Sequence, residues 1–234
     1  MGIFIQAIIE AFKLIFTLNP EILSITLLSL KVSSFAVLFS CLIGIPLALI
    51  ISHNTFPVKK IIIAFIHTGM AIPPVVVGLI VYILLSRNGP LGYLELLYTP
   101  GAMMIAQILL ALPVITGISL TAFNSVKKKT RETVISLGAK WYQYGYQMIR
   151  EARYGLITAL ITGFGAVISE VGAIILVGGN IRFHTRALTT SIVLETQKGE
   201  FAMAMALGFI LLGLAFLITF ILTYIQQKKS ETEN

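Results

Sequence analysis

The hydrophobic positions of this chain fall into long, nearly uncharged runs that are separated by short polar segments. A helix needs about 20 apolar residues to cross a hydrocarbon layer of about 30 Å. Runs of that length cover residues 22–52, 61–86, 101–123, 155–177 and 201–227. Because a backbone in lipid must satisfy its own hydrogen bonds, each run predicts a transmembrane helix. The pattern therefore predicts an all-α integral membrane protein with five spans.

Residues 1–20 follow a different pattern, in which charges interrupt an apolar helical face. The apolar positions are Ile5, Ile8, Ile9, Phe12 and Phe16, with Glu10 and Lys13 among them. Asn19-Pro20 ends the pattern before it is long enough for a comfortable span, which leaves an interfacial helix, a signal sequence or a short sixth span. The segment has neither a basic start nor a small-residue cleavage site. We therefore expect an N-terminal amphipathic helix on the membrane surface.

Composition agrees with this fold class and narrows the function. Hydrophobic residues make up 57% of the 234 residues and charged residues 12%, whereas soluble domains carry about 25% charged residues. We expect residues 1–234 to form a single transmembrane domain. The net charge of +7 would suggest nucleic acid as a partner of a soluble protein, but here we expect lipid and no nucleic acid. The single Cys41 allows no disulfide within the chain, and we expect no metal site.

The basic residues also predict an orientation. Lys and Arg concentrate in residues 53–60, in residues 124–154 and after residue 227, and are sparser in the other connections. Under the positive-inside rule, the central loop and the C-terminus are cytoplasmic and the N-terminus is outside. The chain is thus expected to be a multi-pass protein of the cell (inner, cytoplasmic) membrane.

Residues 124–154 form an unusually long polar, basic and aromatic segment. A basic run, Lys127 to Arg131, is followed by a short predicted helix over residues 132–137 and by Gly138, which suits a turn. A second helix is expected to start near Ala139, with one face formed by Trp141, Tyr144, Gly145, Met148 and Ala152. Two interpretations are open: a linker on anionic headgroups, or a surface that docks a cytoplasmic partner.

The stretch "ETVISLGA", residues 132–139, resembles the EAA-xxx-G coupling motif of ABC importer permeases. Glu132 and Gly138 match, while Thr133 and Val134 replace the two alanines. Downstream, "REARYGL" departs from the general pattern, because Arg150 and Tyr154 stand where proline is common. That stretch, with "ISEVGAIILVGGNIR" and "TRALTTSIVLET", is instead similar to the permeases of tungstate-specific ABC importers, which are close to molybdate permeases. The resemblance covers about residues 22–207.

The resemblance implies a type I ABC importer permease fold that works as a homodimer and takes up an oxyanion, tungstate above others. It implies an external oxyanion-binding protein and ATP-hydrolysing subunits that are docked by the central loop. The coupling residues would be Glu132, Ser136, Leu137, Gly138 and Ala139. The sequence contains no G-x-x-x-x-G-K-[ST] phosphate loop. We therefore expect no catalytic residue and no cofactor in this chain, with ATP and Mg bound by the partner ATPase.

A second group of residues is a candidate for the translocation path or its gate. It comprises Pro73, Pro74, Ser169, Glu170, Arg182 and Arg186. Proline is expected to bend or break its helix, and the same holds for Pro46 and Pro113. A carboxylate within a span needs a polar partner, so Glu170 is either part of a gate or structural, held by an arginine or by helix-end amides. Our specific hypothesis pairs an ionised Glu170 with Arg182 or Arg186. Residues 188–194 are expected to form a short re-entrant helix.

The sequence also allows other functions. The alternatives are an ABC permease for molybdate, sulfate or another oxyanion, an ion-coupled secondary transporter, and a membrane scaffold. Secondary transporters usually show internal repeats and buried charges, and this sequence has no convincing repeat. The ligand of the partner binding protein would separate the oxyanions.

Overall fold

The computed structural model describes residues 20–231 without a break, together with residues 2, 5, 6, 8, 9, 12, 13 and 17, and describes side chains as far as residue 227. The amphipathic helix predicted over residues 1–20 lies largely outside the described residues. The described helices are α2 (Pro20–His53), α3 (Lys59–Met70), α4 (Pro74–Leu85), η1 (Gly92–Leu94), α5 (Pro100–Asn124), α6 (Lys128–Ser136), α7 (Trp141–Ile168), α8 (Gly172–Gly178), α9 (Leu188–Gln197) and α10 (Phe201–Glu231). The fold is all-helical, as predicted.

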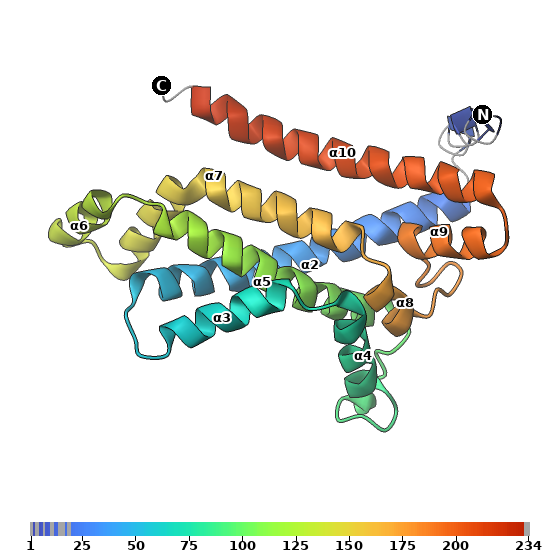
Figure 1. The fold of residues 1–234 in the computed structure, drawn as a ribbon, viewed down its shortest axis with the longest axis horizontal. Coiled ribbons are helices and arrows are strands. Elements are labelled where there is room, and N and C mark those ends of the chain that lie inside the picture. The colour runs from blue at the N-terminus through green and yellow to red at the C-terminus, as the bar shows by residue number, and fades with distance from the viewer. Residues whose placement is uncertain are drawn as a thin grey trace.

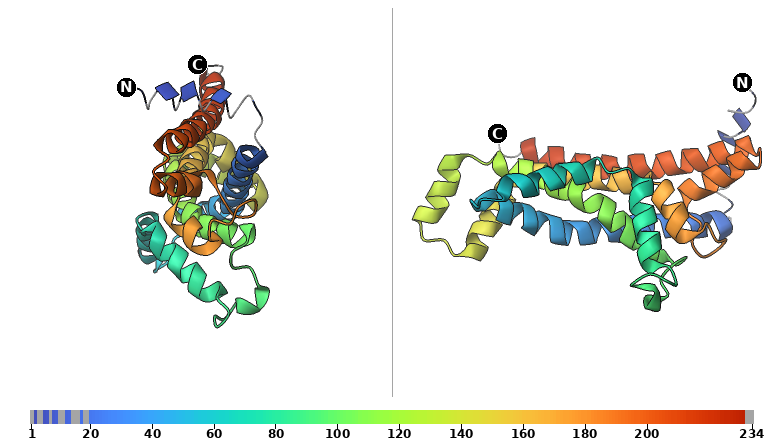
Figure 2. Two further views of the ribbon diagram at one scale, coloured as in Figure 1. Left: turned by 90° about the vertical axis from the view of Figure 1, so that its right-hand side faces the viewer. Right: turned by 60° about the horizontal axis from the view of Figure 1, so that its bottom comes forward.

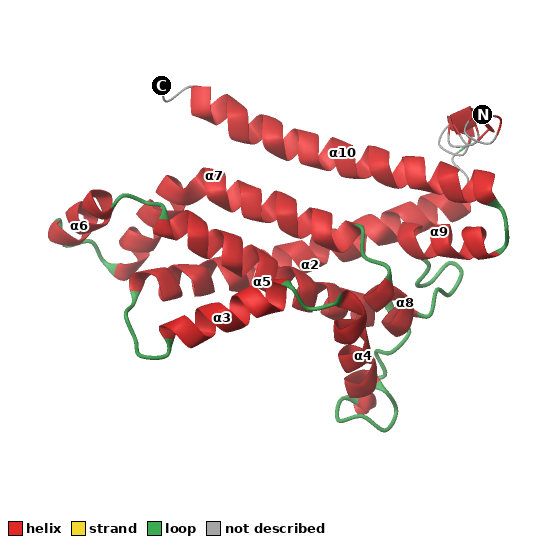
Figure 3. Ribbon diagram, in the orientation of Figure 1, coloured by secondary structure: helices red, strands yellow, loops and turns green. Residues whose placement is uncertain are grey.

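The long helices run lengthwise through the molecule, and shorter helices lie at its two ends (Figure 1). Helix α6 lies at one end, and α9 lies at the other with the start of α10. The right-hand view of Figure 2 keeps this arrangement, and both of its views show α4 projecting from the bundle. Short loops join most of the helices (Figure 3). The two groups of candidate residues therefore belong largely to different parts of the molecule.

Among the described helices, four are long and apolar enough to cross a membrane: α2, α5, α7 and α10, the last over Phe201–Gln227. The predicted second span is divided into α3 and α4, which meet at an angle of 99°. The break falls at Ala71–Pro73, and Pro74 opens α4 at a position where its missing N–H is not needed. Counting the bent pair as one span gives up to five spans.

The prediction for the fourth span needs correction. The amphipathic helix expected near Ala139 and the span expected at residues 155–177 are one continuous helix, α7, which runs from Trp141 to Ile168. No proline or turn interrupts the junction, because Arg150 and Tyr154 occupy positions where proline would break the helix. The span then ends earlier than predicted, and α8 is a separate short helix.

Helix α5 is central to the bundle and packs against α2 and α7. Small residues permit this packing: a Cβ atom placed on Gly163 would lie 2.6 Å from Ile115 Cγ1, and one on Gly155 would lie 2.4 Å from Ala122 Cβ. Such close approach is typical of helices packed in membranes. Pro46 and Pro113 lie inside α2 and α5, and neither ends its helix.

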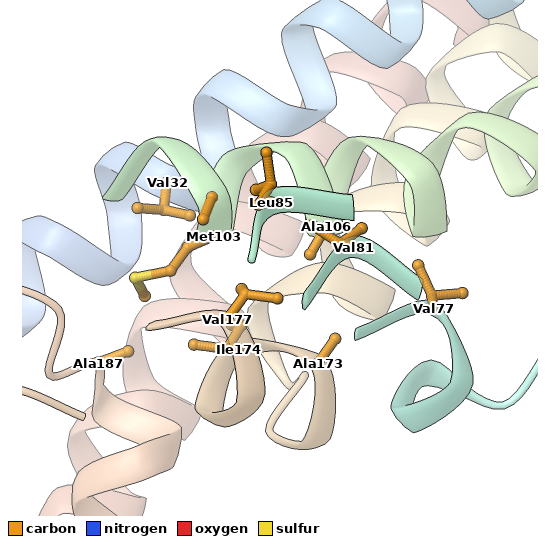
Figure 4. Close-up of a cluster of buried hydrophobic side chains, with 11 residues drawn as sticks. Val32, Val77, Val81, Leu85, Met103, Ala106, Ala173, Ile174, Val177 and Ala187 are labelled. Carbon is orange, nitrogen blue, oxygen red and sulfur yellow. The ribbon is translucent and has the colours of Figure 1, made fainter. Parts of the chain in front are cut away.

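A second packed region joins α4, α5 and α8. Its side chains are mostly small or branched and meet around α8, as Figure 4 shows. A Cβ atom on Gly78 of α4 would lie 2.6 Å from the Ala173 Cα of α8. Helices α4 and α8 are therefore in backbone contact beside the two broken spans.

Candidate functional site: a docking turn and a polar end

The α6–α7 turn is closed by backbone hydrogen bonds. The Gly138 N–H donates to the Ile135 carbonyl over 2.9 Å, and the Ala139 N–H donates to the Val134 carbonyl over 3.4 Å. Gly138 has a φ of +74°. This pattern is the Schellman motif, in which a left-handed glycine satisfies the last carbonyls of a helix. The predicted glycine turn is confirmed, and its geometry explains why glycine occupies this position.

The turn presents apolar side chains to the surroundings. Leu137 is 80% exposed and Ile135 is 54% exposed. Ser136 donates its hydroxyl to the Thr133 carbonyl over 3.0 Å, and Glu132 lies 3.6 Å from Lys128 in an exposed i,i+4 pair. The predicted coupling residues thus lie together, on and directly after one short helix. Exposed leucine and isoleucine side chains at the end of a short polar helix suit contact with another protein.

A groove lies between α6 and the start of α7. Its volume is about 1120 Å³, and its lining combines apolar, hydroxyl, amide and lysine side chains. The lining residues are Lys127, Lys129, Thr130, Thr133, Val134, Leu137, Ala139, Tyr142, Gln143, Tyr146 and Gln147. Leu137 and Ala139 of the predicted coupling set therefore belong to a concave surface.

The turn at residues 135–139, which we call the docking turn after its predicted role, is attached to the bundle by side-chain contacts. The Arg131 guanidinium donates to the Phe123 carbonyl near the end of α5. At the start of α7, the Lys140 N–H donates to Gln143 Oε1 over 2.8 Å. This bond satisfies a backbone N–H that has no acceptor within the helix. Tyr144 is buried, with its ring centroid 4.5 Å from that of His53 at the end of α2. A force on the turn would therefore reach α2, α5 and α7 together.

At the other end of α7, Glu170 holds the start of α8. Its Oε1 accepts a hydrogen bond of 2.9 Å from the Ala173 N–H, and its backbone carbonyl accepts one of 2.9 Å from the Thr189 hydroxyl of α9. Glu170 is 9% exposed. Of the two interpretations, the structural one describes this geometry, with helix-end amides as the partners.

The hypothesis that Glu170 pairs with Arg182 or Arg186 is wrong. Both arginines bind Glu21 in the first turn of α2: Arg182 by two hydrogen bonds of 2.9 and 2.6 Å, and Arg186 by one of 3.2 Å. Hydrogen bonding to this carboxylate and its charge raise the pKa of the Arg182 guanidinium above its ordinary value. The sequence interval between Glu21 and the arginines is so long that no local pattern could have indicated the contact.

The remaining gate candidates divide into two places. Pro73 and Pro74 lie where α4 begins, and a Cβ atom on Gly172 would lie 2.6 Å from the neighbouring Val75 side chain. The start of α4 and the Glu170 region are thus adjacent. Ser169, which directly follows α7, donates its hydroxyl to the Gly165 carbonyl over 2.8 Å and is exposed. Arg182 and Arg186 belong instead to the loop after α8.

One polar residue near this region was missed by the sequence analysis, and a second was considered only as part of the predicted re-entrant helix. Gln107 of α5 is buried and donates from Nε2 to the Val167 carbonyl over 2.8 Å. Thr189 is the donor to Glu170 described above. A glutamine within a span is a signal that the sequence offered, since buried amides in lipid need partners. Among the described residues, no group of three or more His, Cys, Asp or Glu side chains is placed to hold a metal ion.

Comparison with known proteins decides the family. Residues 42–231 match the family described as the binding-protein-dependent transport system inner membrane component. The chain belongs to this family. It is therefore a multi-pass inner membrane permease of the ABC importer type, as the resemblance of "ETVISLGA" implied.

Relatives of this permease include transporters of anions. It is 46% identical over 198 residues to a probable anion ABC transporter permease protein of Haloferax volcanii, covering 82% of this chain and 85% of that protein. It is 38% identical over 218 residues to the tungstate uptake system permease protein TupB of Peptoclostridium acidaminophilum, covering 93% and 96%. The TupB protein of Campylobacter jejuni is 36% identical over 223 residues, covering 94% and 93%.

The fold of the permease also has a solved counterpart. A chain of the crystal structure of a bacterial ABC transporter involved in the import of the acidic polysaccharide alginate superposes with a TM-score of 0.77. The match covers 94% of this chain and 83% of that chain at 19% sequence identity. At this identity the match supports the fold of an ABC importer permease and carries nothing about substrate.

Proposed function

We propose that this permease imports an oxyanion, tungstate above others, as a homodimer driven by separate ATPase subunits. The assignment of tungstate is supported by two relatives that are named as tungstate uptake permeases and match nearly the whole chain. The stretch around Arg150 and Tyr154 supports the same subfamily, since its non-proline residues give the uninterrupted α7.

The observation that carries the coupling mechanism is the docking turn. A helix end that exposes Leu137 and Ile135 and is locked by backbone hydrogen bonds offers a preorganised apolar knob. We infer that this knob seats in a groove of an ATPase subunit, which hydrolyses ATP with Mg. The exposed Glu132 and Ser136 lie at the rim of the contact.

Continuity of α7 gives a route for the movement. The helix has 28 residues, so it extends about 42 Å at 1.5 Å per residue. It begins beside the docking turn and ends directly before Ser169 and Glu170. Closure of the ATPase subunits would move the turn, and α7 would carry that movement as a rigid rod to the junction with α4 and α8. Alternating access then follows from rocking of packed helices about this junction.

The proposal assigns sides to the two ends. The α6 end is cytoplasmic, together with the C-terminus, and the N-terminus and the α9 end face outward, where an oxyanion-binding protein docks. The basic flanks of α6 support this orientation under the positive-inside rule.

Uptake by proteoliposomes tests the function. The permease is reconstituted with its ATPase and binding protein, and ATP-dependent accumulation of tungstate, molybdate and sulfate is measured by mass spectrometry. We expect tungstate to be accumulated at the lowest concentration. Preferential accumulation of molybdate or sulfate would reassign the substrate, and accumulation that needs an ion gradient instead of ATP would reject the ABC mechanism.

A further inference from the structure

A polar cavity of about 460 Å³ lies at the α9 end of the molecule. We call it the α9 cavity. Its lining comes from the start of α2, the loop after α8, α9 and α10: Glu21, Ile22, Ile25, Arg182, Arg186, Ser191, Glu195, Lys198, Met203 and Leu207. Since a water molecule occupies about 30 Å³ of liquid, the cavity has room for a small hydrated ion.

Cations outnumber carboxylates in the α9 cavity. Arg182, Arg186 and Lys198 line it together with Glu21 and Glu195. Lys198 is 2.8 Å from Glu195 on the same helical turn, so these two charges compensate each other. Glu21 is then shared by two arginines, which leaves one positive charge in excess.

Two buried donors in the lining have no hydrogen-bond partner among the described residues. They are the Ser191 hydroxyl and Nε of Arg186. Ser191 is 2% exposed, and it lines the cavity from the second turn of α9. An unsatisfied buried donor is unfavourable, so the cavity favours an occupant that accepts hydrogen bonds.

The Glu21 contact indicates what kind of occupant fits. Arg182 donates two hydrogen bonds to the Glu21 carboxylate, from Nε to Oε1 over 2.9 Å and from Nη2 to Oε2 over 2.6 Å. This two-pronged geometry matches two oxygens of a carboxylate and equally two oxygens of a tetrahedral oxyanion. Glu21 therefore presents to the arginines the same chemistry that an oxyanion would present.

We propose that the α9 cavity is an oxyanion subsite in which Arg182, Arg186 and Ser191 hold a tetrahedral oxyanion and Glu21 holds the arginines when the subsite is empty. The inference rests on the proposed function for its cargo. It adds a binding site within the permease itself, where an oxyanion leaving the binding protein exchanges with the Glu21 carboxylate. Release of Glu21 would remove the ion pairs between α2 and the loop after α8.

Because Glu21 and the oxyanion would compete for the same arginines, substitutions of neighbouring residues should change the affinity for tungstate in opposite directions. Glu21→Gln removes the competitor and is expected to tighten tungstate binding about tenfold, whereas Arg186→Lys and Ser191→Ala each remove a donor and weaken it about tenfold, the size of one hydrogen bond to a charged group. A purely structural ion pair would behave differently, since breaking it from either side would disturb the cavity in the same direction.

The test measures binding without the binding protein. The permease in complex with its ATPase is placed in lipid nanodiscs. Bound tungstate is then measured by equilibrium dialysis with detection by mass spectrometry, and sulfate and phosphate serve as competitors. Arg87→Gln and Glu95→Gln, in the exposed loop after α4, are matched controls that are expected to leave binding unchanged. Melting temperatures identify any variant that fails to fold, and Arg186→Lys keeps the charge for that reason.

Tungstate binding that is tightened by Glu21→Gln and weakened by Arg186→Lys and Ser191→Ala supports the subsite. The subsite is rejected if neither the parent nor Glu21→Gln binds tungstate. It is also rejected if the three substitutions leave tungstate binding unchanged, or if all three weaken it. These results do not depend on the proposed function, because proteoliposome uptake with the binding protein reports on transport separately. An active importer without a subsite and a subsite in an inactive importer are thus distinguishable.

Discussion

A short helix is held in place at each end of the molecule, α6 at one end and α9 at the other, but by different kinds of hydrogen bond. At the α6 end, backbone hydrogen bonds around Gly138 close the turn, and the exposed side chains are left to make contacts elsewhere. At the α9 end, side chains hold the structure: Glu170 and Thr189 bond to backbone groups, and Glu21 binds two arginines. The first arrangement leaves its surface available to a partner, and the second uses its polar groups internally.

This difference suggests a division of labour. A turn held by its own backbone keeps its shape when a partner moves it, so it suits the transmission of force. A region held by ion pairs and single hydrogen bonds can exchange partners at a cost of a few kcal/mol, so it suits a gate.

The largest effect is expected for Gly138→Val. The substitution places a β-branched residue at a φ of +74°, which costs about 1–3 kcal/mol locally and opens the docking turn. We expect co-purification of the ATPase subunit and ATP-dependent uptake to be lost, as measured by affinity purification and proteoliposome transport.

Gly199→Val is the matched control, because Gly199 has a φ of +82° and, like Gly138, has no atom within 4 Å of an added Cβ. It lies between α9 and α10, at the other end. A similar fall in melting temperature with the ATPase retained is expected there. Equal loss of the ATPase in both variants would show that general destabilisation, and not the docking turn, explains the result.

A smaller effect is expected at Glu170, where substitutions separate charge from hydrogen bonding. Glu170→Gln keeps an oxygen that can accept from the Ala173 N–H and is expected to retain most uptake. Glu170→Ala leaves that buried amide without its side-chain acceptor and is expected to cost about 1 kcal/mol, measured as a lower melting temperature. If Glu170→Gln lost uptake at normal stability, transport would need the negative charge of Glu170, and the gate interpretation would be restored.

The long elements of this fold could be predicted from the sequence, because hydropathy over about 20 residues reports directly on burial in lipid. The runs at residues 22–52, 101–123 and 201–227 correspond closely to α2, α5 and α10. The docking turn was also predictable, since the left-handed glycine and the flanking helices are local features. Its assignment to coupling came from the resemblance of "ETVISLGA" and stays a prediction.

What the sequence could not supply are the contacts made across long chain intervals. Glu21 and Arg182 lie on the side that the predicted orientation makes external, but hydropathy does not encode which groups on one side are neighbours. The continuity of α7 was missed for a different reason: the polar start of the helix and its apolar remainder have different hydropathy, although both are helical. Charge alone suggested Arg182 and Arg186 as partners of Glu170, but the packing of the helices places Glu21 beside these arginines.

A modest effect is expected at the link between α9 and Glu170. Thr189→Val removes the hydroxyl that donates to the Glu170 carbonyl over 2.9 Å while nearly keeping the side-chain volume. We expect a loss of about 1 kcal/mol, seen as a lower melting temperature, and a decrease in uptake of no more than a few fold. Thr189→Ser keeps the hydroxyl and serves as the control. Identical behaviour of the two variants would mean that the methyl packing, and not the hydrogen bond, fixes α9.

The smallest effect on stability is expected at the exposed pair of Glu132 and Lys128. Exposed i,i+4 pairs contribute about 0.3–0.5 kcal/mol, so Glu132→Gln should leave the melting temperature nearly unchanged. If Glu132 contacts the ATPase, the same variant should lower uptake several fold, and Lys128→Gln, which breaks the same pair from the other side, should not. Equal and small effects of both variants on uptake would remove Glu132 from the docking surface and leave the apolar Ile135 and Leu137 as its centre.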